Sequence, residues 1–309
     1  MLFSQATQRL SALTFWVVLG GTLFALIWSL SFVVTRLALD EIPPVLLAAI
    51  RLTLSGTMLM ALRLRAAAEL WRSSPSSARQ TILLSGLLSQ AVYLGACYWA
   101  LTAIPTSIVN IFVSSLPLLT IPAAFLVLQE RAGPLEILAV LMGVAGVAIA
   151  VFDADTMGAA SGAYLLAVLL LVVAVASLAL GNTLIKRIVS TRNFLEVCAL
   201  QFLSAGLALL LLAPFLEAMP SLASVVRAIP ELAYLVLFGS ILGTAIWFRL
   251  LTVLTANQAA SFFLLTPIMG ILLGSLVFGE PLTLAKLFGV LVLVTSIALK
   301  VLVTFQNNS

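Results

Sequence analysis

Long, uninterrupted apolar runs constrain the fold of this 309-residue chain more than any other feature of its sequence. Hydrophobic residues make up 63% of the chain and charged residues only 8%, against about 25% charged residues in soluble domains. A soluble protein of this length could not bury so much apolar surface. The runs are continuous rather than alternating, which argues against a transmembrane β-barrel. We therefore expect an all-α polytopic membrane protein.

Ten of these runs are long enough to cross a bilayer as helices, and each is bounded by charges, prolines or polar clusters. The first run is too long for the apolar core of a cleaved secretory signal, so we interpret it as a membrane span. The connections are too short to hold a soluble domain. The predicted spans are Thr14–Thr35, Pro44–Leu62, Gln80–Leu101, Ser107–Leu128, Leu135–Phe152, Ser161–Ile185, Phe194–Phe215, Leu232–Leu251, Gln258–Phe278 and Thr283–Val303.

Positive charge is distributed unevenly over the connections between these spans. If the N-terminus is cytoplasmic, eleven Lys and Arg residues fall inside and three fall outside, with Arg51 left out because it lies within a span. Cytoplasmic loops are enriched in Lys and Arg, so we expect both termini to be cytoplasmic. These basic residues set the topology, and the net charge of +4 therefore does not indicate a nucleic-acid partner.

The two halves of the chain match each other at a constant offset of 150 positions. Each half holds five spans, an odd number, so the two copies must enter the membrane in opposite directions. We expect a first unit at 1–155 and a second at 156–309, arranged as the inverted five-helix repeats common in secondary transporters. The matched positions include Pro117 with Pro267, Glu130 with Glu280, Arg51 with Gln201, and Gly56 with Gly206.

Several kinds of chemistry lack the residues they need. Histidine is absent, and Cys97 and Cys198 fall inside apolar spans. His-dependent hydrolysis, histidine metal ligands and a structural disulfide are therefore not expected. The chain also has no phosphate-binding loop of the G-x-x-x-x-G-K-[ST] type, which excludes an ATP-driven pump of that class. We expect no enzyme activity, no cofactor and no metal, and a non-transporting scaffold or sensor is a less favoured alternative.

Polar and aromatic side chains recur at helical spacing on several spans. Such faces suit a cavity for a small, partly apolar, neutral or zwitterionic solute. The alternative for any single hydroxyl is an interhelical hydrogen bond, worth about 0.6 kcal/mol on average in a membrane. We expect the first copy to contact the solute and the second mainly to supply an apolar wall. The candidate solute-binding residues are Trp28, Thr35, Gln90, Tyr93, Asn110, Ser114, Thr244 and Trp247.

Arg51 is a cation near the middle of the second predicted span. Either it binds a substrate carboxylate, or it anchors neighbouring helices through hydrogen bonds. The matched residue Gln201 is neutral, and we favour the structural role for both.

Four further residues are candidates for structural or gating roles. Glu130 and Glu280 end two matched helices, and we expect each to cap the helix that follows it, with a gating ion pair as the alternative. Pro117 and Pro267 are expected to bend their spans near the middle of the membrane.

Two glycine pairs, Gly239-x3-Gly243 and Gly270-x3-Gly274, have the spacing that lets helices approach closely. We expect them to pack helices within one chain, with a homodimer interface as the alternative. No Asp, Glu, His or Lys lies in the middle of a span, so facilitated diffusion or solute exchange is as plausible as proton coupling.

The chain resembles the drug/metabolite transporter superfamily, in particular its ten-helix EamA-type members. The resemblance extends over nearly the whole chain. It implies transport of a small metabolite or amino acid across the plasma membrane by alternating access, mostly as export, with uptake as the alternative. It does not identify the substrate. The residues that carry it are Trp28-Ser29 with Phe32, Pro43-Pro44, Arg51, Leu116-Pro117 leading to Glu130, and Thr266-Pro267 leading to Gly279-Glu280-Pro281-Leu282.

Overall fold

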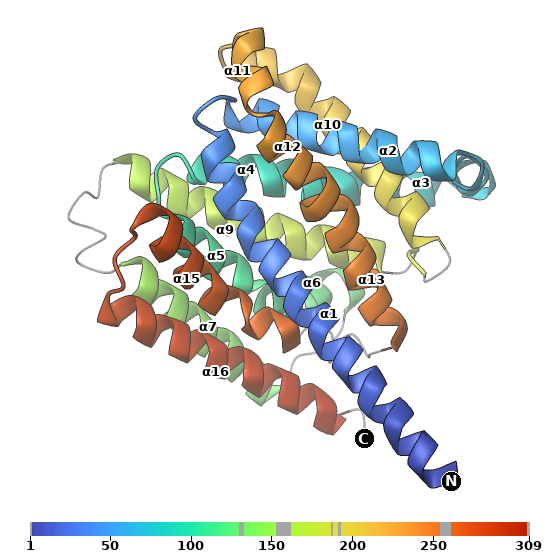
Figure 1. The fold of residues 1–309 in the computed structure, drawn as a ribbon, viewed down its shortest axis with the longest axis vertical. Coiled ribbons are helices and arrows are strands. Elements are labelled where there is room, and N and C mark those ends of the chain that lie inside the picture. The colour runs from blue at the N-terminus through green and yellow to red at the C-terminus, as the bar shows by residue number, and fades with distance from the viewer. Residues whose placement is uncertain are drawn as a thin grey trace.

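The computed structural model describes residues 2–129, 133–152, 162–186, 188–190, 193–253 and 261–307. Within these residues every regular element is a helix, as the apolar runs predict (Figure 1). The first half contains α1 (Leu2–Ala38), α2 (Pro44–Ser73), α3 (Ser76–Gly86), η1 (Leu87–Val92), α4 (Tyr93–Ala100), α5 (Thr106–Ser114), α6 (Leu116–Leu128) and α7 (Pro134–Val151). The second half contains α9 (Gly162–Ile185), α10 (Phe194–Leu216), α11 (Leu222–Arg227), α12 (Ile229–Tyr234), η2 (Leu235–Leu242), α13 (Gly243–Val253), η3 (Ser261–Leu264), α15 (Thr266–Phe278) and α16 (Leu284–Asn307).

The described helices account for most of the predicted spans. Seven are long and apolar enough to cross a bilayer, and the bent pair α5–α6 makes an eighth. Two shorter apolar helices, α15 and the part of α16 from Leu284 to Leu299, fall where the ninth and tenth spans are predicted. The chain is therefore a multi-span helical membrane protein, whereas the count of ten spans stays a prediction. The predicted unit boundary at 155/156 and the side chain of Glu130 lie outside the described residues.

Helices that match between the two halves also pack against each other. The most extensive interhelical contact in the described residues joins α2 to α10, and the next joins α7 to α16. A Cβ atom added to Gly56 would lie 2.5 Å from the backbone N of Leu203, and one added to Gly206 would lie 2.5 Å from the backbone N of Thr53. The contact partners are matched positions themselves, and the numbering falls along one helix as it rises along the other. The α2–α10 crossing is therefore antiparallel and maps onto itself when the two halves are exchanged.

A helix break precedes the proline in both proline-containing segments, and the bend stays a prediction for the second of them. Helices α5 and α6 meet at Ser115 with a bend of 43°, and the matched residue Leu265 separates η3 from α15. Pro117 and Pro267 each occupy the first turn of the helix after the break. A proline is tolerated there because its missing N–H would have no intrahelical partner in any case. The break therefore lies two residues before each proline.

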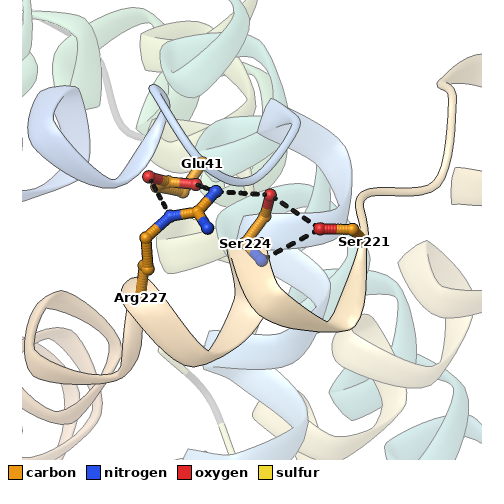
Figure 2. A network of polar contacts seen from close by, with 4 residues as sticks. All are labelled: Glu41, Ser221, Ser224 and Arg227. Carbon is orange, nitrogen blue, oxygen red and sulfur yellow. Dashed lines mark hydrogen bonds and ion pairs between the residues drawn. The ribbon is translucent and has the colours of Figure 1, made fainter.

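A polar cluster ties the α1–α2 connection to α11 (Figure 2). Nε and Nη2 of Arg227 donate to the two carboxylate oxygens of Glu41, each at 2.7 Å. Nη2 also donates to Oγ of Ser224 at 3.0 Å, and Oγ of Ser221 accepts from the backbone N–H of Ser224 at 3.1 Å. Ser221 is thus the N-cap of α11. The cluster fixes a short surface helix of one half against the other half.

A candidate solute cavity between two π-helical segments

Two short π-helical segments, η1 and η2, interrupt the third and eighth predicted spans at matched positions. A π turn holds one more residue than an α turn and shifts the side chains that follow it, and such turns are frequent at functional sites. Segment η1 carries Ser89 and Gln90, and η2 carries the matched Gly239 and Ser240. All four residues line one cavity. The two π segments therefore supply facing parts of a single site, one from each half.

This cavity has a volume of about 110 Å³, against roughly 300–1,000 Å³ for pockets that bury drug-sized ligands. Its size suits a small solute. The polar side chains in its wall are Ser31, Thr35, Arg51, Ser89 and Gln90 from the first half, with Ser240 and Thr244 from the second. The aromatic side chains are Trp28, Phe32, Tyr93, Tyr98 and Phe202. A wider surface depression lies on the end of α2, but residues 64–73 of that single helix form all of it, so it encloses nothing.

Arg51 is the charged residue among the described residues of the cavity wall. Its side chain is 7% exposed. Nε donates to Oγ of Ser240 at 3.0 Å and Nη1 donates to the hydroxyl of Tyr98 at 2.5 Å. Gly239 lets η2 come close to the guanidinium, because a Cβ atom there would lie 3.0 Å from Nη2 of Arg51. The arginine thus joins α2 to α4 and η2 while part of it faces the cavity.

Gln201 joins the matched spans in the other half through a serine at a different position. Its Nε2 donates to Oγ of Ser85 at 2.7 Å, whereas the residue that matches Ser240 is Gln90. A Cβ atom on Gly86 would lie 2.9 Å from Cα of Gln201, so α3 and α10 approach closely there. The structural role of this matched pair stays a prediction. Unlike Arg51, Gln201 does not line the cavity.

Most of the predicted solute-binding residues meet at this cavity. Trp28, Thr35, Gln90, Tyr93 and Thr244 line it. Thr35 is fully buried, and its Oγ1 has no hydrogen-bond partner within the described part of the chain. Their role in binding a solute stays a prediction, but the spacing that selected them does bring them together.

Trp247 lies beside the cavity rather than in its wall. Its ring stacks on Phe24 with centroids 5.0 Å apart and meets Phe263 edge-on at 5.5 Å. Trp28 contacts the same two phenylalanines, with centroids 5.6 Å from Phe24 and 5.7 Å from Phe263. Trp247 therefore supports the position of Trp28 through a shared aromatic cluster.

Asn110 and Ser114 lie in the α5–α15 interface and not at the cavity. Oγ of Ser114 is 2.6 Å from Oγ1 of Thr266. Asn110 is 1% exposed, and a Cβ atom added to Gly270 would collide with its side chain. Helical spacing identified the polar face of α5 correctly, but a close-packed helix covers that face. The second half also contributes more than an apolar wall, because Ser240 and Thr244 come from it.

Glu280 caps a helix, but a different one from the helix expected. Its carboxylate accepts hydrogen bonds from the backbone N–H groups of Thr106, at 2.6 Å, and Ser107, at 3.0 Å, which begin α5 in the other half. The prediction that it caps the following helix, α16, is thus corrected. Helix α15 ends in a left-handed turn at Gly279, with φ of 65°, which carries Glu280 back over Gly274 toward α5. Glu130 lies outside the described residues.

The glycine pairs are used inside this chain. Gly270 faces Asn110, Gly274 faces the carboxylate of Glu280, and Gly239 faces Ser31 and Arg51. This agrees with the packing role expected for these pairs. A homodimer stays a prediction. These glycines do not supply its interface, because they face residues of the same chain.

Ser89, Tyr98 and Phe202 are cavity residues that sequence reasoning did not select. Single serines and aromatics are too common in apolar helices to stand out. The repeat offset is the signal that would have found Ser89, because Ser89 matches Gly239 of the predicted packing pair.

Comparison with known proteins gives a consistent result. The sequence model of the EamA-like transporter family matches this chain twice, at residues 15–152 and 165–302. An uncharacterized transporter of Bacillus subtilis, YvbV, is 27% identical over 274 residues, which are 89% of this chain and 88% of that protein. The uncharacterized inner membrane transporter YedA of Escherichia coli K12 is 28% identical over 288 residues, 91% of this chain and 90% of that protein.

A solved crystal structure shares the fold. It superposes with a TM-score of 0.65 at 18% sequence identity, over 95% of this chain and 99% of the other. At this identity the likeness concerns the fold alone. The two family matches together span most of the chain and fall on its two repeated halves. This protein is therefore a membrane transporter that belongs to the EamA-like transporter family.

Proposed function

We propose that this protein is a secondary transporter that moves a small organic metabolite, an amino acid or a similar amphipathic solute, out of the cell across the plasma membrane. It works by alternating access of the central cavity and needs neither ATP nor a cofactor. The observation that carries the proposal is the cavity itself. It lies between matched π segments of two homologous halves, so a relative movement of the halves would change the side from which it is reached.

The proposed architecture is ten spans in two inverted units, 1–155 and 156–309, with both termini cytoplasmic. The antiparallel α2–α10 crossing supports the inversion. In Figure 1 the start of α1 and the end of α16 both lie toward the lower right, which supports termini on one side. Polar contacts between connections also agree with the charge distribution: Arg63 pairs with Glu196 on the proposed inner side, and Arg227 pairs with Glu41 on the outer side.

Single cysteines test this topology. Ser73 and Ser221 are exposed in connections assigned to opposite sides of the membrane. In intact cells a membrane-impermeant thiol reagent should label Ser221→Cys, whereas Ser73→Cys should react only after permeabilisation. The native Cys97 and Cys198 are both buried and provide a low background. The opposite labelling pattern would reverse the proposed orientation.

Transport is tested with the purified full chain in liposomes preloaded with a mixed metabolite extract. Efflux measured by mass spectrometry should reveal solutes lost faster than from protein-free liposomes. A folded protein that moves no solute from a broad panel would refute the proposal. In cells, overexpression should raise tolerance to toxic analogues of the solute, and lowered tolerance would instead indicate uptake.

Two substitutions connect transport to the cavity. Trp28→Ala removes an aromatic wall and should change the rate or selectivity of efflux by at least tenfold. Asn110→Ala, in the α5–α15 interface, should lower stability without changing selectivity. A selectivity change from Asn110→Ala alone would place the solute against α5 and away from this cavity.

A further inference from the structure

We propose that Arg51 makes the cavity selective for organic anions, and that the solute places a carboxylate against its guanidinium. This inference rests on the proposed function and names the substrate class of the same site. It keeps the proposed transporter but replaces the amino acid, and the neutral or zwitterionic solute expected from the polar stripes, with a solute that carries a carboxylate and no ammonium group. Three observations carry it: donor atoms of Arg51 left for a ligand, a buried charge with no protein counter-charge, and the neutral residue at the matched position.

The hydrogen-bond inventory of Arg51 leaves donors for a ligand. A guanidinium has five N–H donors, and the contacts to Ser240 and Tyr98 use one on Nε and one on Nη1. Nη2 has no hydrogen-bond partner in the described part of the chain. Several other side-chain atoms in the described residues are both buried and without a hydrogen-bond partner. Nη2 is not one of these buried atoms, so it is accessible. Nη1 and Nη2 together form the edge that binds a carboxylate through two parallel hydrogen bonds.

Among the described residues, no carboxylate compensates the charge of Arg51. Within the described residues the ion pairs are Arg63 with Glu196 and Arg227 with Glu41, both at the ends of spans. Among the residues of the cavity wall that the structure describes, none is Asp or Glu. A buried charge without a partner is costly, particularly inside a membrane. A bound carboxylate supplies the missing negative charge next to the guanidinium of Arg51, which is already desolvated in the folded protein.

The matched pair of residues separates anchoring from charge. Gln201 bonds Ser85 on the third predicted span, and Arg51 bonds Ser240 on the matched eighth span, five positions further along the repeat. A neutral amide is therefore sufficient to join this pair of spans. Of the two matched residues, only Arg51 is charged, and only Arg51 lines the cavity. A purely structural arginine leaves that difference unexplained.

The remainder of the wall defines the rest of the solute. Trp28, Phe32, Tyr93 and Phe202 offer apolar surface, and Gln90 and Thr244 offer neutral hydrogen-bonding groups. An ammonium group would find no carboxylate in the described part of this wall. A volume of about 110 Å³ limits the solute to a small molecule. The class that fits is a small monocarboxylate with an apolar or aromatic body.

Binding by the full-length protein in lipid nanodiscs tests this inference. The probes are monocarboxylates from propionate to phenylacetate, each compared with its neutral carboxamide. Ligands that bind the folded state raise the unfolding temperature, and isothermal calorimetry then gives the affinities. We expect carboxylates to bind at least tenfold more tightly than their amides. Equal affinities, or no carboxylate binding across the series, would overturn the proposal.

Variants then assign the preference to the charge. Arg51→Gln reproduces the neutral anchor seen at Gln201 and should abolish the carboxylate preference while the protein remains folded. Arg51→Lys keeps the charge and should restore part of the preference. Gln201→Leu, the control at the matched position, breaks the bond from Gln201 to Ser85 outside the cavity and should leave the preference intact. A folded Arg51→Gln protein that still prefers carboxylates would contradict the assignment.

The same liposome assay separates this inference from the function on which it rests. Transport of neutral solutes by a folded protein that shows no carboxylate preference would leave the transporter proposal standing and remove Arg51 as its selectivity element. The absence of any flux would instead remove the transporter proposal, whatever the binding data show.

Discussion

The carboxylate of Glu280 accepts a hydrogen bond from the backbone N–H of Thr106 at 2.6 Å, so the second half of the chain caps a helix of the first. Glu217 does the same at the start of α2, where its two oxygens accept from the backbone N–H of Val45 at 2.9 and 3.1 Å. Helix N-termini carry unpaired N–H groups and a partial positive charge, which a carboxylate satisfies. Both caps cross between the halves, on the proposed outer side.

Neutralising this cap should destabilise the protein. Glu280→Gln leaves one acceptor oxygen where the carboxylate has two, and removes the charge that faces the start of α5. Hydrogen bonds to charged groups are worth about 1.5–3 kcal/mol, and we expect a loss in that range in the free energy of unfolding, measured by denaturant titration in micelles. Glu69→Gln, on the exposed end of α2, is the control and should change nothing. Equal effects of the two substitutions would argue against the cap.

The α2–α10 crossing predicts a second pair of effects. Gly56→Ala and Gly206→Ala each place a methyl group about 2.5 Å from backbone atoms that cannot move independently. Overpacking of this kind costs about 1–3 kcal/mol and occasionally more. Thermal unfolding in detergent should show similar losses for both variants, since the two sites are equivalent. Gly95→Ala, which meets no atom within 4 Å, should be neutral or stabilising.

The ends of α6 and α15 predict one stabilising and one destabilising substitution. Both helices end in the left-handed conformation at matched positions, Gln129 with φ of 58° and Gly279 with φ of 65°. A side chain in this region costs roughly 1–2 kcal/mol, whereas glycine adopts it freely. Gln129→Gly should therefore stabilise the protein by about 1 kcal/mol, and Gly279→Gln should destabilise it by a similar amount. Unfolding titrations that show the same sign for both would contradict this.

The Glu41–Arg227 pair predicts a pH dependence (Figure 2). The hydrogen bond from Arg227, followed by its charge, lowers the pKa of Glu41 below its ordinary value, although burial opposes this shift. The pKa of Arg227 is raised in turn, chiefly by the same hydrogen bond. A lowered carboxyl pKa gives stability that is present above the ordinary pKa and is lost as the pH falls through the folded value.

Arg227→Gln should therefore lower the unfolding temperature slightly at neutral pH. The difference from the unmodified protein should close in acid, as Glu41 becomes protonated, and in high salt, which screens exposed charges. Arg65→Gln removes an exposed arginine on α2 and is the control. A difference that persists unchanged into acid would show that Arg227 acts through contacts other than its ion pair.

The sequence predicted the helical architecture and the repeat well, for definite physical reasons. Apolar runs bounded by charge are required of any membrane helix. The constant offset of Gly56 with Gly206 reflects a contact that each half must make with the other. Helical spacing also selected Trp28, Gln90 and Thr244, which line one cavity. Residues that line a cavity share a face of their helix, and this pattern is visible in the sequence.

Other features depend on which helix packs against which face. The residue pattern of one helix does not contain this information. Asn110 and Ser114 form a polar face whether a cavity or α15 lies opposite, and only the packed structure shows that it is α15. Glu280 was assigned to the next helix because sequence proximity is visible, whereas the nearness of α5 is not. The π segments leave no residue signature, since they differ from α-helix only in the backbone hydrogen-bond register.

The self-matching α2–α10 crossing has a consequence for the transport cycle. In a protein of two inverted copies, the opposite-facing state is generated when the halves exchange their conformations. A contact that the exchange maps onto itself has the same energy in both states, so it cannot bias the balance between them. Under the proposed alternating access, Gly56 and Gly206 would thus form an energetically neutral pivot, and unequal elements such as Arg51 and Gln201 would be the ones that tilt the equilibrium.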